Sequence, residues 1–378
     1  MENGKVLFIL LYINNEAIKL IRVAIVLEDF SIGGAQRVVS ELVQHIDAQK
    51  VKLLVLCLWE RSDTALAEAA EKVADVRYLG IHGKNLIANY FRISKILRSF
   101  HPDIVHAHLV GQLYAVPWGL LNHVPVLITA HTKPRKAFIK KIEWLIRYGV
   151  NHKKIWIAAV SQENLDLVKA YFPGAETQCL CINNGINIHS FYRKEHADFT
   201  FINVARQDEN KNQMAILRAF HCLYLQRNDI KLILAGDGPC HEKLAAEVKK
   251  LGLDQVVLLP GKVDQVSDYY AVADVYVQSS HREAMPMSVL EALAAGLPII
   301  STDVGGLHDV VKGNGILCPD YDGEAIYQAM KRLLFMSSGE RKLMIRGSQN
   351  ISKNYSSDKM AKRYESVYCE VIENVNKS

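Results

Sequence analysis

Residues 279–306 constrain the fold of this chain more than any other segment, because they predict a complete β–loop–α–β unit. Residues 275–278, just before them, are rich in β-branched and aromatic side chains, which favours a buried strand. Residues 288–295 are strong helix formers, and residues 297–301 have the composition of the next strand. Gly296 suits the position that ends the helix. The segment is therefore typical of one unit of a parallel α/β sheet.

The chemistry of this unit lies in its loop and at the start of its helix. The first backbone N–H groups of a helix have no partner within it, so those near Ser288, Val289 and Leu290 form a site for an anion. Glu283 lies in the loop, and Glu291 follows eight residues later. Carboxylates accept hydrogen bonds from sugar hydroxyls, so this pattern suits a polyhydroxylated ligand that carries a phosphate. An ordinary β–α crossover with two solvated glutamates explains the spacing equally well.

The segment resembles the Glu-x7-Glu motif of glycosyltransferase family 4, with Glu283 and Glu291 as the two glutamates. The resemblance implies an α/β protein of GT-B architecture, in which two facing, doubly wound Rossmann-like domains have a cleft between them. It also implies a retaining enzyme that uses a nucleotide diphosphate sugar. Two residues depart from the family pattern, because Ala284 stands where Gly is usual and Met285 where Leu or an aromatic residue is common. If that Gly has a positive φ, Ala284 changes the local geometry.

Arg206 and Lys211 follow the first strand expected in the second half of the chain. Two cations beside a helix N-terminus suit a diphosphate, although surface charge explains the pair as well. Together with the downstream glutamates, they resemble the family's Arg…Lys pair that holds the donor diphosphate. Residues 236–239 resemble the family's Gly-x-Gly-Pro turn, and Gly261 lies in a loop that the family places near the nucleotide base.

Gly33 and Gly34 separate the first expected strand from a helical pattern. Paired glycines let a backbone approach a ligand closely, but many β–α turns contain Gly. The pair resembles the family's Gly-Gly-Ala-Glu-Arg loop, with Gln36 where Glu is commoner. His131 follows another expected strand at its C-terminal end, where ligands bind in such sheets. A capping or solvated His is the alternative; the resemblance places this residue beside the donor sugar.

The resemblance thus assigns roles to a set of residues on both halves of the chain. Glu283 is expected to hold the sugar hydroxyls and Glu291 the ribose, while fixed cations stabilise the departing diphosphate as a metal does elsewhere. No metal or cofactor is expected. The predicted catalytic residues are His131, Glu283, Arg206 and Lys211. The predicted donor-binding residues are Gly33, Gly34, Gly236, Gly261, Met287, Ser288, Val289, Leu290 and Glu291.

Two other pairs of side chains have metal-ligand chemistry. His106 and His108 form an i, i+2 pair at a strand end, but no third ligand lies nearby, so lining a loop is the better interpretation. Asp320 and Asp322 form an Asp-x-Asp, which metal-dependent transferases use on a different fold. Because a helical pattern follows directly, we interpret Asp322 as a helix N-cap.

The length of 378 residues suggests two domains. The seven cysteines include no Cys-x-x-Cys, which favours a reducing compartment and disfavours structural zinc. No apolar run approaches the roughly 20 residues of a membrane span, and residues 6–13 make a poor signal peptide. We therefore expect a cytoplasmic protein, with peripheral association to the cytoplasmic face of the inner membrane.

The positive charge of the chain is concentrated in its first half. Residues 1–190 carry 22 Lys+Arg against 16 Asp+Glu, and residues 191–378 carry 23 against 24. Residues 133–154 interleave basic with apolar and aromatic side chains, the composition of a helix on anionic lipid. A core-packed helix with a solvated basic face is nearly as good an interpretation. The residues predicted to touch a membrane are Lys136, Lys140, Lys141, Trp144 and Arg147.

We divide the chain into four parts. Residues 1–20 form an N-terminal extension, residues 21–190 an acceptor-side Rossmann-like domain, residues 191–355 a nucleotide-sugar-binding Rossmann-like domain, and residues 356–378 a helix that crosses back to the first domain. The assignment of the last part follows from the resemblance and from apolar residues at helical spacing.

The expected function is transfer of a sugar, with retention, to an acceptor hydroxyl of a lipid-linked glycan or surface-polysaccharide precursor. A nucleotide-sugar epimerase of the same fold and a non-catalytic scaffold of a glycan assembly complex are alternatives. A nicotinamide-dependent dehydrogenase is disfavoured, because the full Gly-x-Gly-x-x-Gly is absent. Nucleic acid is not expected as a partner, since large aliphatic residues interrupt the basic run. The sequence does not specify the donor sugar, its base, the acceptor or the oligomeric state.

Overall fold

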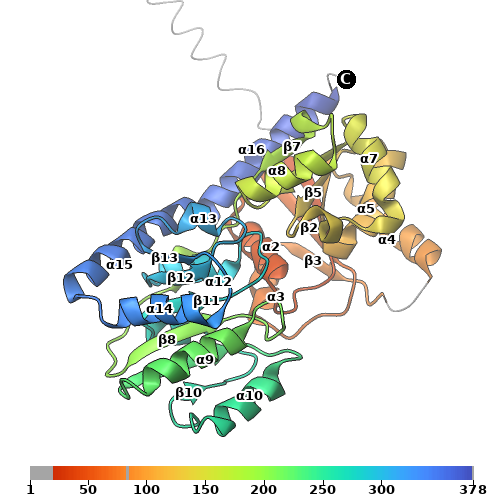
Figure 1. Ribbon diagram of the computed structural model, residues 1–378. Coiled ribbons are helices and arrows are strands. Elements are labelled where there is room, and N and C mark those ends of the chain that lie inside the picture. The colour runs from red at the N-terminus through yellow and green to blue at the C-terminus, as the bar shows by residue number, and fades with distance from the viewer. Residues whose placement is uncertain (1–19, 82–84, 377–378) are drawn as a thin grey trace, which may run out of the picture.

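The computed structural model describes residues 20–81 and 85–376, so the predicted extension lies almost wholly outside the described residues. Two parallel sheets, each flanked by helices, form two domains (Figure 1). The central strands are buried on both faces, as expected for parallel sheets covered by helices, whereas the strands at the sheet edges are partly exposed. The predicted α/β architecture with two Rossmann-like domains is confirmed.

The first domain has a seven-stranded sheet in the order β3-β2-β1-β4-β5-β6-β7. The order reverses between β1 and β4, so the loops after these two strands leave at the switch point where such sheets bind ligands. Its strands are β1 (Ile21–Leu27), β2 (Val51–Cys57), β3 (Asp75–Tyr78), β4 (Ile104–His108), β5 (Val126–Ala130), β6 (Ile155–Ala159) and β7 (Cys179–Cys181). Its helices are α2 (Gly34–His45), α3 (Ala65–Glu71), α4 (Leu86–Phe100), α5 (Gln112–Leu121), α6 (Pro134–Ala137), α7 (Glu143–Asn151) and α8 (Gln162–Tyr171).

The second domain has a six-stranded sheet in the order β10-β9-β8-β11-β12-β13, which reverses between β8 and β11. This is the strand order of a dinucleotide-binding Rossmann sheet. Its strands are β8 (Phe199–Val204), β9 (Ile230–Ala235), β10 (Val257–Leu258), β11 (Val275–Gln278), β12 (Ile299–Thr302) and β13 (Gly315–Cys318). Its helices are α9 (Gln213–Tyr224), α10 (His241–Lys250), α11 (Val266–Ala271), α12 (Met287–Ala294), α13 (Leu307–Val310), α14 (Gly323–Leu334) and α15 (Ser338–Ser352).

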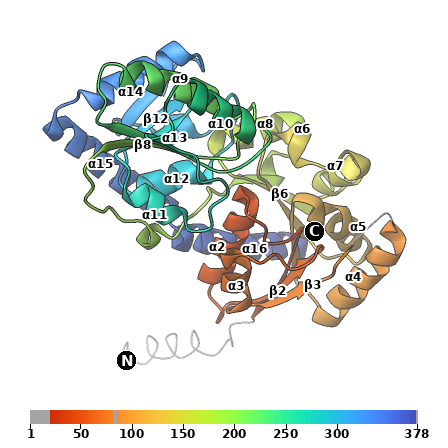
Figure 2. The ribbon, with the colours of Figure 1, turned by 90° about the horizontal axis from the view of Figure 1, so that it is seen from below.

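The last helix, α16 (Ser357–Asn376), runs back along the first domain beside α2 (Figures 1 and 2). Its apolar stripe is fully buried, and Ser357 at its start donates a hydrogen bond to Glu41 of α2 at 2.7 Å. A single cluster of buried apolar side chains joins residues of both domains with those of α16. The C-terminal segment therefore fixes the two domains against each other. The stripe consists of Tyr364, Val367, Tyr368 and Val371.

Residues 133–154 do not form the single amphipathic helix that their composition suggests. They form α6, the short 3-10 helix η2 (Lys140–Ile142) and α7, separated at Phe138 and Ile139, whose backbones are extended. Phe138 is buried because it packs against Tyr171 and Phe172 of the neighbouring α8 region. The expectation of one helix through residues 133–154 is therefore wrong at Phe138, since tertiary packing overrides the local pattern.

The same segment still presents predicted membrane residues on its outer side. Trp144 is 68% exposed, and Lys136, Lys140 and Lys141 are also exposed. Arg147 is held instead by Glu143, with 2.8 Å between Arg147 Nη2 and Glu143 Oε1. Across residues 20–81 and 85–376, the structure contains no helix long and apolar enough to cross a bilayer.

Candidate functional site

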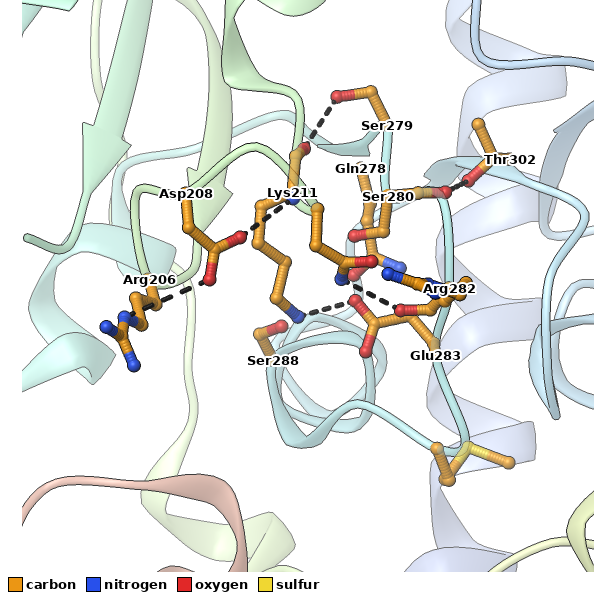
Figure 3. Close-up of polar contacts among 12 residues, drawn as sticks. Arg206, Asp208, Lys211, Gln278, Ser279, Ser280, Arg282, Glu283, Ser288 and Thr302 are labelled. Atoms are coloured by element: carbon orange, nitrogen blue, oxygen red, sulfur yellow. Dashed lines mark hydrogen bonds and ion pairs between the residues drawn. The ribbon is translucent and has the colours of Figure 1, made fainter. Parts of the chain in front are cut away.

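The loops after β8 and β11 meet where the strand order of the second sheet reverses. Lys211 and Glu283, one from each loop, form an ion pair there, with 2.5 Å between Lys211 Nζ and Glu283 Oε1 (Figure 3). Their side chains are only 19% and 11% exposed. Because ligands of open α/β sheets bind at such a switch point, the pair marks the candidate site. Two of the four predicted catalytic residues are thus in contact.

Arg206 lies beside this pair but outside it. Its side chain is 71% exposed, and its Nε is 3.9 Å from Asp208 Oδ2. The other oxygen of Asp208 accepts a hydrogen bond from the backbone N–H of Lys211 at 3.1 Å. Figure 3 shows Arg206 and Lys211 on either side of Asp208. Arg206 therefore faces solvent, whereas Lys211 is already paired with a carboxylate.

Helix α12 begins at Met287 without a side-chain cap and without an acidic residue in its first turn. The backbone N–H of Val289 donates to the Pro286 carbonyl at 3.2 Å, so the prediction of a free N–H at Val289 is wrong. Leu290 is the fourth residue of the helix, where the regular pattern pairs the N–H with that same carbonyl. The anion site at this helix end therefore narrows to the N–H groups of Met287 and Ser288.

The loop that carries Glu283 accommodates Ala284 without strain, because Ala284 does not have a positive φ. The residue whose backbone packs closely against this loop is Gly305 instead. Its φ is +64°, and a Cβ added to it would lie 2.6 Å from the Glu283 carbonyl oxygen. The N–H of Gly306 donates to the Ala284 carbonyl at 2.7 Å. Gly305 and Gly306 thus hold the Glu283 loop in place, and the departure at Ala284 leaves its geometry intact.

Two other predicted donor-binding glycines lie next to each other. The N–H of Gly236 donates to the Gly261 carbonyl at 2.8 Å. Gly236 has a φ of +132°, and a Cβ added there would lie 1.9 Å from the carbonyl oxygen of Ala205, just after β8. Only glycine fits this position, so the turn after β9 packs directly on the strand that leads to Arg206.

Glu291 is the predicted ribose ligand, and it is already paired across the domain boundary. Its Oε1 lies 2.8 Å from Arg37 Nη1 of α2, and its Oε2 accepts the Tyr270 hydroxyl at 3.0 Å. Its side chain is 3% exposed. Burial and the nearby Glu291 carboxylate raise the pKa of Tyr270 well above its ordinary value, so the phenol stays a neutral donor. A ribose that reaches Glu291 has to share or displace these partners.

The first domain also approaches α12 and its preceding loop. A Cβ added to Gly34 would lie 3.9 Å from Met287 Cγ, and Asn184 donates to the Met285 carbonyl at 3.0 Å. Figure 2 shows α2 beside α12, the two helices that the Arg37–Glu291 pair joins. Gly33 is the N-cap of α2 and has extended backbone, with φ −167°. Its predicted contact with the donor stays a prediction.

His131 follows β5 and is partly exposed, with its Nε2 2.8 Å from Nδ1 of His108. His106 and His108 lie in β4 and are fully buried, so the prediction that they line a loop is wrong. The two ring nitrogens of His106 lie 2.8 Å from the hydroxyls of Tyr368 and Thr129. Burial lowers the pKa of His131 to about 4, so its imidazole is neutral at neutral pH.

No group of three or more His, Cys, Asp or Glu side chains suited to a metal ion occurs among the described residues. Asp322 is the N-cap of α14, and its Oδ1 accepts the Ala325 N–H at 2.8 Å, as predicted. Metal independence of the reaction stays a prediction.

One hollow on the second domain lies apart from these residues. It has a volume of about 590 Å³ and is lined mainly by residues 193–199, none of which is a predicted site residue. Its arginines are neutralised, Arg193 by Asp274 and Arg227 by Asp229. The chemistry therefore concentrates around Lys211 and Glu283 rather than in this hollow.

Comparison with known proteins identifies the family of this chain. The family description "Glycosyltransferase Family 4" matches residues 32–190, and "Glycosyl transferases group 1" matches residues 186–350. The chain belongs to glycosyltransferase family 4. The two matched regions meet at residues 186–190, where the first domain ends, so each domain of this family 4 chain corresponds to one matched region.

Three curated relatives have low sequence identity to this chain but match more than half of its length. N-acetyl-alpha-D-glucosaminyl L-malate synthase of Bacillus anthracis is 24% identical over 74% of this chain and 78% of its own. Putative glycosyltransferase EpsD of Bacillus subtilis is 28% identical over 68% of this chain and 74% of its own. Alpha-monoglucosyldiacylglycerol synthase of Streptococcus pneumoniae is 26% identical over 55% of this chain and 53% of its own.

Solved structures share the fold at low identity. Anabaena Alr3699/HepE, solved in complex with UDP and glucose, has a TM-score of 0.78 and 15% identity, covering 92% of this chain and 99% of its own. WaaG, a glycosyltransferase involved in lipopolysaccharide biosynthesis, has a TM-score of 0.71 and 15% identity over the same shares. These similarities establish the GT-B fold of the family 4 chain.

Several residues of the site were not assigned from the sequence. Arg37 stands in the quoted Gly-Gly loop, but its role depends on α12, which lies about 250 residues away in the sequence. Tyr270 is a helix residue with no motif around it, and its contact with Glu291 arises from packing of α11 on α12. The contact between His108 and His131 could have been expected from the sequence, because His108 ends β4 and His131 directly follows the neighbouring strand β5.

Proposed function

We propose that this chain is a retaining glycosyltransferase that moves a sugar from a nucleotide diphosphate sugar to an acceptor hydroxyl without a metal ion. The observation that carries the proposal is the contact between Lys211 and Glu283 at the switch point, directly before the uncapped start of α12. A cation and free N–H groups suit a diphosphate, and a carboxylate suits sugar hydroxyls. The solved complexes of Alr3699/HepE with UDP and with UDP-glucose support this class of donor.

In this proposal the bond between the anomeric carbon and the diphosphate oxygen breaks as the acceptor oxygen attacks from the same face. The acceptor hydroxyl gives its proton to the leaving phosphate oxygen, so no protein base is needed. Lys211, Arg206 and the N–H groups at Met287 and Ser288 stabilise the negative charge that develops on the diphosphate. Glu283 positions the sugar hydroxyls, and closure of the domains excludes water.

Glu291 and His131 complete the proposed donor site from its two sides. Glu291 accepts hydrogen bonds from the ribose after exchanging one of its present partners, Arg37 or Tyr270. Neutral His131 meets the transferred sugar as a hydrogen-bonding group. Gly34 lets the first-domain loop approach the diphosphate and the acceptor closely.

We further propose that the acceptor is a lipid-linked glycan or polysaccharide precursor on the cytoplasmic face of a membrane. The exposed Trp144 and the neighbouring Lys136, Lys140 and Lys141 suit an anionic lipid surface. Arg147 contributes less, because Glu143 neutralises it. The name of the Streptococcus relative, a glucosyldiacylglycerol synthase, also favours a lipid acceptor.

Vesicle sedimentation tests the membrane part. A variant with Trp144→Ala, Lys140→Gln and Lys141→Gln should lose binding to vesicles of anionic phospholipid. A matched variant with Lys249→Gln and Lys250→Gln, on α10 of the second domain, should bind as the unchanged protein does. Equal sedimentation of both variants and the parent protein would remove this part of the proposal.

A thermal-shift screen against UDP, GDP, ADP and TDP, each with and without EDTA, tests the donor part. One nucleotide should raise the melting temperature, and EDTA should not diminish the shift. An epimerase of the same fold would convert a nucleotide sugar with no acceptor present, which product analysis distinguishes. A scaffold would give no shift with any nucleotide.

A further inference from the structure

His131 is held from behind by a residue to which the proposed mechanism gives no role. His108 ends β4, is fully buried, and places its Nδ1 2.8 Å from His131 Nε2. The two rings lie 5.1 Å apart at 33° to each other. The contact occupies one of the two ring nitrogens of His131. His131 Nδ1 makes no hydrogen bond to the described residues, so that nitrogen remains for a ligand.

His108 is itself fixed by a buried network that the C-terminal helix completes. Its ring lies 4.1 Å from the ring of His106, whose two nitrogens both lie 2.8 Å from hydroxyl oxygens. One of these hydroxyls belongs to Tyr368 of α16, and the other, on Thr129, lies 3.0 Å from the Tyr364 hydroxyl of the same helix. The network therefore fixes the His106 ring while α16 is in place, and His108 packs against that fixed ring.

The backbone beneath His131 is fixed as well. Asn164, a buried residue of α8, donates from its Nδ2 to the carbonyl of Ala130 at 2.7 Å. Ala130 is the last residue of β5, directly before His131. Side chain and backbone of His131 are thus both held by buried groups, which is what a residue needs to meet a ligand in one geometry.

The unpaired ring nitrogen of His108 indicates which of the two rings donates the hydrogen bond between His108 and His131. Nε2 of His108 is buried and has no hydrogen-bond partner. If it carried the proton, an N–H would be buried unpaired; if it is the bare nitrogen, only a lone pair is unpaired. Buried N–H groups without a partner are the rarer and costlier case. The proton of His108 therefore belongs on Nδ1, where it is donated to Nε2 of His131.

We propose that His108 is a positioning residue that fixes the tautomer of His131, so that His131 presents an Nδ1–H donor to an oxygen of the donor sugar. The identity of the ligand in this inference rests on the proposed function. The tautomer of His131 rests only on the hydrogen-bond geometry. Burial lowers the pKa of His108 well below its ordinary value and that of His131 to about 4, which keeps both rings neutral and the tautomer defined.

Nitrogen-15 NMR of the ligand-free protein, labelled at histidine, tests the tautomer directly. The chemical shifts of the ring nitrogens distinguish N–H from bare nitrogen, and the spectra of His131→Ala and His108→Leu assign the signals. We expect the proton of His131 on Nδ1 in the parent protein and a mixture of tautomers in His108→Leu. A proton on Nε2 of His131 in the parent protein overturns the inference, whether or not the chain is a transferase.

Calorimetric titration with UDP and with UDP-glucose tests the consequence. The extra affinity for UDP-glucose over UDP should fall about five- to tenfold in His108→Leu, the loss of one hydrogen bond. His108→Asn, whose side-chain amide can donate from the place of Nδ1, should restore most of it. UDP affinity should stay unchanged in both variants and in His152→Ala, a surface control, which shows that the site is folded.

The outcomes distinguish a failure of the positioning role of His108 from a failure of the proposed function. Retention of the full sugar preference in His108→Leu, or failure of Asn to restore a lost one, contradicts a positioning role. If no nucleotide diphosphate binds the parent protein, the proposed function fails, and the NMR experiment alone then decides the tautomer assignment.

Discussion

On the second-domain side of the candidate site, Lys211, Arg206 and Glu283 are charged and partly open to solvent. On the first-domain side, His131 is neutral and rests on a buried chain of hydrogen bonds through His108. The charged side suits a ligand whose charge changes during reaction, and the neutral side suits hydroxyls that only need to be held. The comparison teaches that the two domains offer a ligand different chemistry, with the charges of Lys211 and Arg206 on one side and the neutral imidazole of His131 on the other.

The largest expected effect falls on the charged side. Lys211→Ala should lower the release of UDP from UDP-glucose about 100-fold, because a fixed cation at a developing charge is worth that much. Arg206→Ala should lower it about tenfold or less, since Arg206 is exposed and loosely held. Steady-state kinetics measure both, with Lys231→Ala, an exposed ion-pair lysine, as control. Equal effects of Lys211→Ala and Arg206→Ala would contradict the difference assigned to the two cations.

The loop that carries Glu283 gives the next effect. Gly305→Ala should destabilise the protein by about 2 kcal/mol or more, because it combines a positive φ with a clash against backbone. Gly252→Ala has a similar φ, +66°, in open space and should cost about 1 kcal/mol. Urea unfolding measures the two variants side by side. If both variants lose the same free energy of unfolding, the close approach of Gly305 to the Glu283 loop does not contribute to stability.

These glycines show how far the sequence alone could predict the site. The Glu-x7-Glu spacing and the strand endings correctly placed Lys211, Glu283 and the start of α12 in one region. They could not show that Gly305 meets the backbone at Glu283, because that contact depends on the packing of two loops. The sequence therefore predicted the residues of the charged side but not how its loop is held.

The neutral side and the basic segment were harder to predict. A strand-end histidine pattern does not reveal that His106 is covered by α16, which comes more than 200 residues later, or that His108 is buried against it. The period of apolar residues in 133–154 did not reveal that Phe138 leaves the helical path to pack on Phe172. In both cases long-range packing decides the local structure, and a local pattern does not contain it.

The pair that joins the two sides gives an intermediate effect. Arg37→Met should destabilise the protein by about 2 kcal/mol, because it leaves the buried Glu291 with Tyr270 alone. Arg37→Met combined with Glu291→Gln should recover part of this loss. Urea unfolding of the single and double variants measures the coupling. Strictly additive effects would mean that the Arg37–Glu291 pair does not link the domains.

The smallest effect concerns the pH dependence of the neutral side. The pKa of folded His131, about 4, lies below that of an unfolded His, about 6.5, so the unfolded state binds more protons between these values. Stability that His131 contributes at pH 7 is therefore lost as pH falls through this window. Between pH 7 and pH 5, His131→Asn should lose about 1–2 kcal/mol less than the parent protein. Identical pH dependence in urea unfolding would show that His131 is not held neutral.

The proposed roles of the two sides are tested most directly by titrating UDP and UDP-glucose, in the presence of EDTA, into the parent protein, Lys211→Ala and His131→Ala. The account predicts that Lys211→Ala weakens both ligands by a similar factor, whereas His131→Ala weakens only UDP-glucose. Unchanged UDP affinity in Lys211→Ala, or a loss of UDP affinity in His131→Ala, would contradict the assignment of the diphosphate to Lys211 and of a sugar contact to His131.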